Sequence, residues 1–489
     1  MISKKDFKKI NDYLWEIPKS FREDMRVPAR IYASEKLLRE TEDEALIQLI
    51  NTTTMPGIVK YAIAMPDIHS GYGPPIGGVG AMRLPEGVIS PGFVGYDENC
   101  GCRVLLSEYS EKEIRPYLDE LATEIQKEVP SGLGRGRQIK LSIEQIDKIL
   151  EGGVPYLVEK GYGEKEDIDN CEHKGKMEQA DASCVSDHAK NRGRDQVGTL
   201  GSGNHFCEID KVEEIFDEKL AEVFGLFKDQ VVVMIHSGSR GLGHQNCTDY
   251  LRIVMQALPK YGIKLPDREL ACVPFNSPEG QRFFKAMSAA CNFAWSNRHM
   301  IMCYIRRAWK NVLMEKAKLK LLYDVAHNIA KVEEHEVDGP NSAKTTMGKQ
   351  KMKLIVHRKG ATRAFPPGHP EIPEKYKDTG QPVIIPGTMG TSSYILVGTE
   401  KSKEAWYTVC HGSGRTMSRH AAMRAVAGQE VVKKLVQRGI IIKCQSLKGI
   451  AEEAPFAYKD VDEVVNTVDK AGLARKIARL RPLAVIKGE

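Results

Sequence analysis

Four short segments of the chain carry carboxylate, thiol and imidazole side chains in patterns that can bind metal ions. Asp97 and Cys100 stand three residues apart in a turn that follows an apolar run, so both can face one point. His205, His236 and His327 each lie beside glycine, serine or asparagine. Such a ligand set suits Zn, Mn or Fe rather than Mg alone. Taken singly, these residues also fit a turn with a buried thiol and structural histidines. Together they predict a two-metal site of the kind that polarises phosphoryl oxygens.

A fifth segment, Cys410 to Arg415, is the candidate for a covalent nucleophile. His411 follows an apolar strand and precedes three small residues. Imidazole can accept a phosphoryl group, and glycine amides with Arg415 can stabilise the charge on it. The order of strand, histidine, small residues and arginine also occurs at Val231–Arg240, which indicates two phosphate-binding loops. A loop that only binds phosphate, and tight turns that only need glycine, remain as alternatives.

Basic residues gather near these loops, at Lys349, Lys351, Lys353, His357, Arg358, Lys359 and Arg363. Alternating lysines around Lys351 predict one charged strand face, and Arg415, Arg419 and Arg424 follow the His411 loop. Charge runs are usually solvated surface. Because these adjoin the phosphate loops, we interpret them as a groove for an RNA backbone, with salt-sensitive binding.

Several common nucleotide-enzyme motifs are missing from the sequence. No Gly-x-x-x-x-Gly-Lys-Ser/Thr occurs, which excludes a P-loop enzyme. No dinucleotide fingerprint and no Lys-x-Asp-Gly occur, so a lysine-adenylate ligase is not expected. His205 and Glu208 lack the His-Glu-x-x-His spacing of zinc proteases.

Helices and strands of mixed order must position these residues. Amphipathic patterns with capping residues predict helices at Ser34–Asn51, Glu111–Glu128, Ser142–Glu151, Gly280–Lys318 and Ser418–Arg438. Apolar, β-branched runs predict strands at Val88–Val94, Val231–Ile235, Leu354–Val356, Val383–Ile385, Tyr394–Val397 and Trp406–Cys410. The two kinds of element do not alternate regularly, so we predict an α+β fold.

Composition indicates a soluble globular protein rather than a membrane or secreted protein. The 489 residues are 42% hydrophobic and 28% charged, which is typical of a globular chain. No apolar run approaches the roughly 20 residues that cross a bilayer, and Met1–Trp15 lacks a signal-like apolar stretch. Eleven cysteines without paired C-x-x-C motifs exclude a zinc ribbon and argue against a disulfide framework. We predict a cytoplasmic protein of one compact domain, residues 1–489, without a membrane partner. The net charge of +6 permits a nucleic-acid partner without indicating one.

Over nearly its whole length the chain resembles RtcB-type RNA ligases. The motifs that carry the resemblance are Met65–Gly73, Gly95–Gly101, Gly201–Glu208, His236–Gly243, His327–Ala330, His357–Arg363, Pro386–Gly390 and the His411 loop. Agreement of so many motifs in one order by chance is negligible.

The resemblance implies one domain of unusual fold that uses two Mn²⁺ ions and GTP, with His411 as the catalytic residue that carries GMP. It implies these metal ligands: Cys100, His236 and His327 for one ion, and Asp97, Cys100 and His205 for the other. It implies these guanine-nucleotide contacts: Asn204, His205, Phe206, Cys207, Glu208, His327, Asn328, Pro386, Gly387, Thr388, Met389, Ser393, His411, Gly412, Ser413, Gly414, Tyr458 and Lys487.

The chemistry implied by the family joins broken or spliced RNA, in tRNA splicing or RNA repair. GTP guanylylates His411, a 2′,3′-cyclic phosphate is opened to a 3′-phosphate, GMP passes to that phosphate, and a 5′-hydroxyl displaces it. An archease-type activating protein is a further expected partner. Two other functions stay open: a two-metal cyclic-phosphate or phosphodiester hydrolase, and a non-catalytic RNA-binding subunit.

Three residues depart from the usual family pattern. Glu98 and Cys102 replace an aliphatic residue and a valine, and Ser413 replaces an alanine. Glu98 is expected to add a carboxylate beside the metal site and to alter metal preference. Cys102 is expected to add redox sensitivity. None of the three removes an expected ligand.

Overall fold

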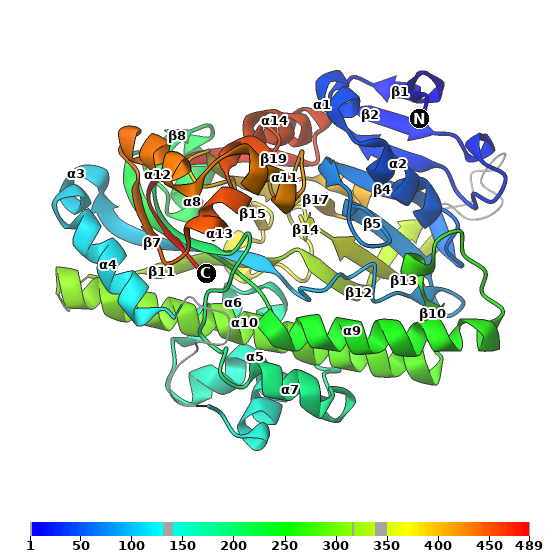
Figure 1. Cartoon of the computed structure of the whole chain (residues 1–489), viewed down its shortest axis with the longest axis horizontal. Coiled ribbons are helices and arrows are strands. Elements are labelled where there is room, and N and C mark those ends of the chain that lie inside the picture. Colours follow the sequence, from blue (N-terminus) through cyan, green and yellow to red (C-terminus); the bar gives the residue numbers. More distant parts are fainter. Residues whose placement is uncertain (1, 131–139, 315–316, 338–349, 489) are drawn as a thin grey trace.

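Two large mixed β-sheets and a layer of long helices build the protein (Figure 1). The computed structural model describes residues 2–130, 140–314, 317–337 and 350–488. Helices α9 and α10 run side by side along one side of the molecule, with α5 and α7 packed against them (Figure 1). The predicted α+β class is confirmed.

One sheet has seven strands, which pair in an order that differs from their order in the sequence. In spatial order they are β1 (Lys8–Asn11), β2 (Leu14–Ile17), β3 (Ala29–Tyr32), β4 (Ile58–His69), β5 (Ile76–Arg83), β13 (Gln350–Lys359) and β12 (Asn328–Val337). Only β3 and β4 pair in parallel. The pairing of β5 with β13 joins the N-terminal part of the chain to the strand that follows His327.

The second sheet brings distant segments to a common edge. Its strands are β11 (Lys320–Ala326), β7 (Gly101–Ser110), β9 (Gln230–Ser237), β8 (Phe206–Ile215), β19 (Ala474–Lys487), β16 (Ser393–Gly398) and β15 (Pro382–Ile385), with β18 (Ile441–Cys444) parallel to β19. Two-stranded ladders join β6 (Val88–Ile89) to β10 (Val273–Pro274) and β14 (Ala361–Arg363) to β17 (Thr408–Cys410).

The helices pack against these sheets, and the largest apolar core lies between helices and sheets. They are α1 (Glu35–Glu40), α2 (Asp43–Thr52), α3 (Glu111–Ile114), α4 (Leu118–Glu128), α5 (Ile143–Glu159), α6 (Lys165–Asp169), α7 (Asp187–Gly193), α8 (Glu218–Phe224), α9 (Arg240–Ala257), α10 (Pro278–Leu313), α11 (Arg419–Ala425), α12 (Gly428–Gln437), α13 (Leu447–Glu452) and α14 (Val461–Ala471). None of the described helices is long and apolar enough to cross a membrane.

The longest helix, α10, shows how the sequence sets these boundaries. Ser277 caps it by accepting a hydrogen bond from the Gly280 amide, and Pro278 occupies the first position, where its missing N–H costs nothing. The helix ends where Met314 takes a positive φ of 72°. It is buried on nearly all sides in its middle, so its polar residues there must be hydrogen-bonded.

The expected helices are present, three of them divided. The pattern from Glu111 forms α3 and α4, with the 3-10 turn Arg115–Tyr117 between them. The pattern from Ser34 forms α1 and α2, since the Thr41 hydroxyl donates to the Leu37 carbonyl and ends the first helix. The pattern from Ser418 forms α11 and α12, because Val426 is extended. The predicted strand Val88–Val94 is correct only for its first two residues, because proline and glycine follow shortly after them.

Candidate metal and nucleotide site

Strand pairing in the eight-stranded sheet explains why the predicted ligands meet. β9 is antiparallel to both β7 and β8, so His236 near its end lies opposite Cys102 and Phe206 near their beginnings. β11 is antiparallel to β7 and ends opposite Gly101, which places His327 at the same edge. β19 is antiparallel to β8, and its last residue, Lys487, pairs with Phe206.

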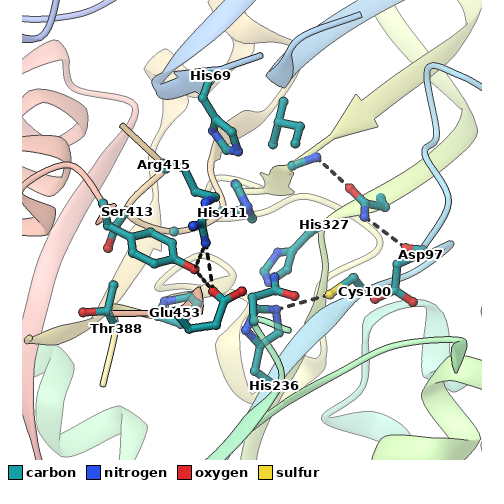
Figure 2. A pocket seen from close by; sticks show the side chains of 18 of the residues that line it. His69, Asp97, Cys100, His236, His327, Thr388, His411, Ser413, Arg415 and Glu453 are labelled. Carbon is teal, nitrogen blue, oxygen red and sulfur yellow. Dashed lines mark hydrogen bonds and ion pairs between the residues drawn. The ribbon is translucent and has the colours of Figure 1, made fainter. Parts of the chain in front are cut away.

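Five side chains that the sequence predicts as ligands lie together there. Figure 2 shows four of them: Asp97, Cys100, His236 and His327. The Cys100 Sγ lies 3.2 Å from His236 Nε2 and 3.6 Å from His205 Nε2. His205 Nε2 is 2.8 Å from Asp97 Oδ2. Two groups have potential ligand atoms within 4.8 Å of one another: Asp97, Cys100 and His205, and Cys102, His236 and His327. Cys100 is a member of the first group, and its Sγ also lies close to His236 of the second, in which Cys102 stands where Cys100 was expected.

Hydrogen bonds outside the groups turn individual ligand atoms inward. His327 Nδ1 lies 2.8 Å from the Thr362 hydroxyl, and this hydrogen bond fixes the ring so that Nε2 is turned to the other side. That Nε2 is buried and has no hydrogen-bond partner within the described residues. The Ser239 amide donates to Asp97 Oδ1 at 3.0 Å, which leaves Oδ2 facing His205.

Burial sets the protonation of these groups. It lowers the pKa values of His236 and His327 well below the usual range, so both imidazoles are neutral. Burial would raise the pKa of Asp97, but the charge of His205 and its hydrogen bond outweigh this, and the carboxyl stays ionised. Burial raises the pKa of the Cys100 thiol, which therefore releases its proton when a cation binds.

The imidazole of His411 is held by a carboxylate from the other sheet. Asp67, in β4, accepts hydrogen bonds at one oxygen from His411 Nδ1 (2.5 Å) and from the amides of His411 (3.0 Å) and Gly412 (3.3 Å). A carboxylate only accepts, so Nδ1 carries the hydrogen and Nε2 has the free lone pair. The His411 and His327 ring centres are 5.4 Å apart, which puts this nitrogen's ring beside the metal-ligand groups.

A cavity of about 420 Å³ opens over the metal-ligand groups and His411 (Figure 2). That volume is within the range of small-molecule sites. Its wall includes these predicted residues: Asp97, Cys100, Asn204, Phe206, His236, His327, Asn328, Pro386, Gly387, Thr388, Met389, His411, Gly412, Ser413, Gly414, Tyr458 and Lys487.

The sequence was compared with those of known proteins and protein families. Residues 48–488 match the family described as tRNA-splicing ligase RtcB. The chain belongs to the RtcB family. It is 51% identical over 486 residues to a protein named tRNA-splicing ligase RtcB from Thermococcus kodakarensis, covering 98% of both chains. A protein of that name from Aeropyrum pernix is 51% identical over 487 residues, covering 98% of this chain and 99% of its own. One from Archaeoglobus fulgidus is 51% identical over 485 residues, covering 98% of both.

Four residues that the RtcB resemblance assigns lie outside the cavity wall. His205 does not line the cavity, but its Nε2 lies next to the Asp97 carboxylate and the Cys100 thiol, where a metal ligand is expected. Cys207 packs into the largest core, so only its backbone is available. Glu208 is fully buried, and its two oxygens lack partners among the residues described. Ser393 accepts a hydrogen bond from the Gly387 amide at 2.9 Å and shapes the loop before β16.

Burial keeps Glu208 and its strand neighbour Asp210 protonated. Both stand on β8 two residues apart and therefore face the same side. Burial raises the pKa of Glu208 well above its usual value, and the nearby Asp210 adds to the shift. Burial likewise raises the pKa of Asp210 to about 8. A neutral carboxyl can donate one hydrogen bond and accept others.

The far wall of the cavity carries a second group of charges. Glu453 accepts hydrogen bonds from Arg415 at 3.1 Å, from Arg419 at 3.0 Å and from the Tyr458 hydroxyl. Lys487 donates to the carbonyls of Gly203 and His205, and burial lowers its pKa to about 8. Three cations and one carboxylate line this wall, so it attracts an anion such as a phosphate.

Two residues of α10 form hydrogen bonds to the loops that carry the metal-ligand groups. Neither was predicted from the sequence motifs. Asn297, in α10, donates to the carbonyls of Thr199 and Gly238 at 3.1 Å and accepts from the Gly198 and Thr199 amides. Arg298 donates to the carbonyls of Asn99 (2.7 Å) and Ser237 (3.0 Å). The one available signal is a pair of polar residues inside an apolar helix.

The carboxylate partner of Arg298 also belongs to this support. Arg298 binds Asp324 through both oxygens, at 2.8 and 2.9 Å, and Arg103 donates to the same carboxylate at 2.8 Å. All three side chains are fully buried. The guanidinium therefore has a fixed position from which it holds the loop before β7 and the end of β9.

The predicted RNA groove along the basic strip is wrong for most of its residues. His357, Arg358, Lys359 and Arg363 are at most 5% exposed. Arg358 donates to both oxygens of Glu333 on the neighbouring strand. Lys351 and Lys353 are exposed but lie opposite Glu336 and Glu334. Lys349 lies outside the described residues.

The three departures from the RtcB pattern have different surroundings. Glu98 is fully buried, belongs to neither metal-ligand group, and accepts from Asn246 Nδ2 at 2.9 and 3.1 Å. It therefore lies apart from the cluster that it was expected to join. Ser413 has a buried hydroxyl without a partner in the part of the chain described. Cys102 is a member of the second metal-ligand group.

Proposed function

We propose that the protein is an RNA ligase that uses GTP and Mn²⁺ and joins 2′,3′-cyclic-phosphate or 3′-phosphate ends to 5′-hydroxyl ends. The observation that carries the proposal is His411, whose Nδ1 is bound by Asp67 so that Nε2 is left as the nucleophile. Its ring lies next to His327 in a cavity lined by candidate metal ligands and cations. Membership of the RtcB family, whose relatives are named tRNA-splicing ligases, supports tRNA splicing as the setting.

The residues present fit two Mn²⁺ ions. Thiol, imidazole and carboxylate donors converge, and the buried His327 Nε2 lacks any other partner within the described chain. We assign one ion to Cys100, His236 and His327, and the other to Asp97, Cys100 and His205. When bound, the ions supply positive charge for phosphoryl oxygens and for the attacking oxygen.

The first step forms a covalent bond to the protein. His411 Nε2 attacks the α-phosphorus of GTP, so a P–N bond forms while the P–O bond to the β-phosphate breaks and pyrophosphate leaves. The ring gains positive charge in this step, and Asp67, 2.5 Å from Nδ1, stabilises it. The cations of the far wall and the Gly412–Gly414 loop line the same cavity as His411 and would stabilise charge on the transferred phosphate and the leaving group.

The later steps act on RNA ends. Water opens a cyclic phosphate to a 3′-phosphate, an oxygen of that phosphate attacks the phosphorus of the histidine-bound GMP, and the P–N bond breaks. A 5′-hydroxyl then attacks the 3′-phosphorus, and GMP leaves as the new phosphodiester forms. These products balance one GTP consumed against GMP and pyrophosphate released.

The decisive experiment labels GTP at the α-phosphate. Protein incubated with Mn²⁺ and this GTP is denatured, and the label is followed through acid and alkali. A phosphoramidate is expected to be lost in acid and kept in alkali, and His411→Ala is expected to stay unlabelled. The same variant should still seal RNA supplied with a preformed guanylylated 3′ end. Label on His411→Ala, or label only from the γ-phosphate, would reject the nucleophile and favour the hydrolase.

A further inference from the structure

Cys102 is a thiol at a strand position that faces the metal-ligand groups. It lies on β7 directly opposite His236 on β9, and the two side chains of such a pair stand on the same face of the sheet. The thiol is fully buried. Its sulfur and one ring nitrogen each of His236 and His327 lie within 4.8 Å of one another. The resemblance to RtcB-type ligases implies a valine at this position, where this chain has a cysteine.

The surroundings of this thiol point to a ligand. His327 Nε2 is buried, is turned inward by the bond from Nδ1 to Thr362, and has no other partner among the described residues. His236 has a second neighbouring sulfur, because the Cys100 Sγ is 3.2 Å from its Nε2. His236 therefore has two thiols nearby, Cys102 within its own group and Cys100 from the neighbouring group.

We propose that Cys102 is a ligand of the ion held by His236 and His327, in addition to the shared Cys100. This inference rests on the metal pair of the proposed function. Each thiol loses its proton to solvent when its metal–sulfur bond forms. The ion at this position then has two nitrogen and two sulfur ligands, whereas the other position keeps Asp97, His205 and the shared Cys100.

The consequence is a pair of unlike metal positions. Two imidazoles with two thiolates form the tetrahedral donor set that favours Zn²⁺, while a set with a carboxylate and one thiolate is better suited to Mn²⁺. A valine at this position would leave only one, shared, sulfur at the first ion. The additional thiolate therefore raises the affinity of this position for a soft cation such as Zn²⁺ relative to Mn²⁺, while both positions keep donors that bind Mn²⁺.

Cobalt provides a direct count of sulfur ligands, because Co²⁺ bound to thiolate has a charge-transfer band whose intensity scales with the number of Co–S bonds. The full chain is titrated with Co²⁺ as wild type, Cys102→Val, Cys102→Ser and, as control, Cys272→Val. Cys272 is buried in the largest core and belongs to neither metal-ligand group. Valine fits a strand, so Cys102→Val should fold.

With two Co²⁺ bound, the band of Cys102→Val is expected to fall by about one third, from three Co–S bonds to two. Its affinity for Zn²⁺ should fall about tenfold or more, with a smaller change for Mn²⁺. Cys102→Ser should lose the same share of the band, and Cys272→Val none. An unchanged band and Zn²⁺ affinity in both Cys102 variants would make Cys102 a core thiol and overturn the inference. Absence of any cobalt–thiolate band in the wild type would instead reject the metal pair itself.

Discussion

At the scale of single residues, the contact between Asp67 and His411 decides which nitrogen can attack. Replacing Asp67 by Asn removes the negative charge beside Nδ1 and no longer forces the hydrogen onto that atom. We expect the initial rate of GMP transfer from GTP to the protein to fall by on the order of 10²-fold or more. Sealing of RNA with a preformed guanylylated end should change far less, because it bypasses His411. Asp12→Asn, at an exposed ion pair, is the matched control; an unaltered labelling rate in Asp67→Asn would contradict the assigned role.

A second residue-scale prediction concerns Lys359, whose ammonium is buried and donates to the carbonyls of Tyr72 and Pro74. Burial lowers its pKa to about 7. Between pH 7 and the ordinary lysine pKa of about 10.4 the unfolded chain binds a proton that the folded chain does not, so stability rises with pH. In metal-free protein, the difference in unfolding free energy between wild type and Lys359→Met should therefore increase by up to about 1.4 kcal/mol per pH unit.

Denaturant unfolding of both proteins across this range measures the difference. Below pH 6 both states carry the charge, so the difference should be flat there, which serves as an internal control. A flat difference from pH 7 to pH 10 would show that Lys359 stays charged in the folded protein.

The sequence predicted site residues correctly where the adjacent residues in the chain also form a recognisable motif. His236 and His411 could be identified because glycine and serine follow a strand at both places. Asp67 is different: it stands inside β4 among apolar residues, and its partner His411 is 344 residues away. Only the fold gives it a role. Arg358 was misread for the same reason, since alternation along β13 does not reveal that Glu333 lies beside it.

At the scale of elements, α10 acts as the rigid support of the site. The Asn297 side chain holds the loops at Gly198–Thr199 and Ser237–Gly238 through both its donor and its acceptor atoms. Asn297→Ala leaves those buried backbone groups without partners, so we expect a loss of about 3 kcal/mol in unfolding free energy. Metal content after dialysis should fall as well, because Gly238 adjoins His236.

Chemical denaturation and elemental analysis check this prediction. Asn311→Ala is the matched control: the residue is exposed on the same helix and donates to Glu124 at 2.9 Å. It should change unfolding free energy by less than about 0.5 kcal/mol. Equal effects from the two substitutions would argue against α10 as the support of the site.

Element prediction from sequence was best where apolar spacing was long and unbroken, as in α10. It failed for α9, which begins at Arg240-Gly-Leu-Gly, because glycine disfavours helix and the segment resembles a loop. The strands β7 and β8 were also missed, since polar ligands stand where they begin. The pairing of β7 with β9, which brings Cys100 to His236, depends on contacts across more than 100 residues.

At the scale of the whole molecule, the site draws on both sheets: Asp67 lies in one, and the metal-ligand groups stand at the edge of the other. If the chain forms a single domain, as the sequence predicts, the two sheets should unfold together in one transition. Trp15 packs against the core of the seven-stranded sheet, whereas Trp295 is buried in the helical core. In each variant that keeps only one of these tryptophans, its fluorescence and the far-UV circular dichroism of that same variant should give the same midpoint in denaturant, as one cooperative unit does. Midpoints that differ beyond error would divide the chain into separate domains.

The position of β19 has a consequence for biosynthesis. This strand lies between β8 and β16, yet it is made after both of them. During translation β8 and β16 are therefore present without the neighbour that they share, and unpaired strand edges recruit other chains. A nascent chain of this protein would need protection from self-association until Ala474–Lys487 has emerged. Chains that stop before Ala474 are accordingly expected to sediment as aggregates, whereas full-length product should stay in the supernatant.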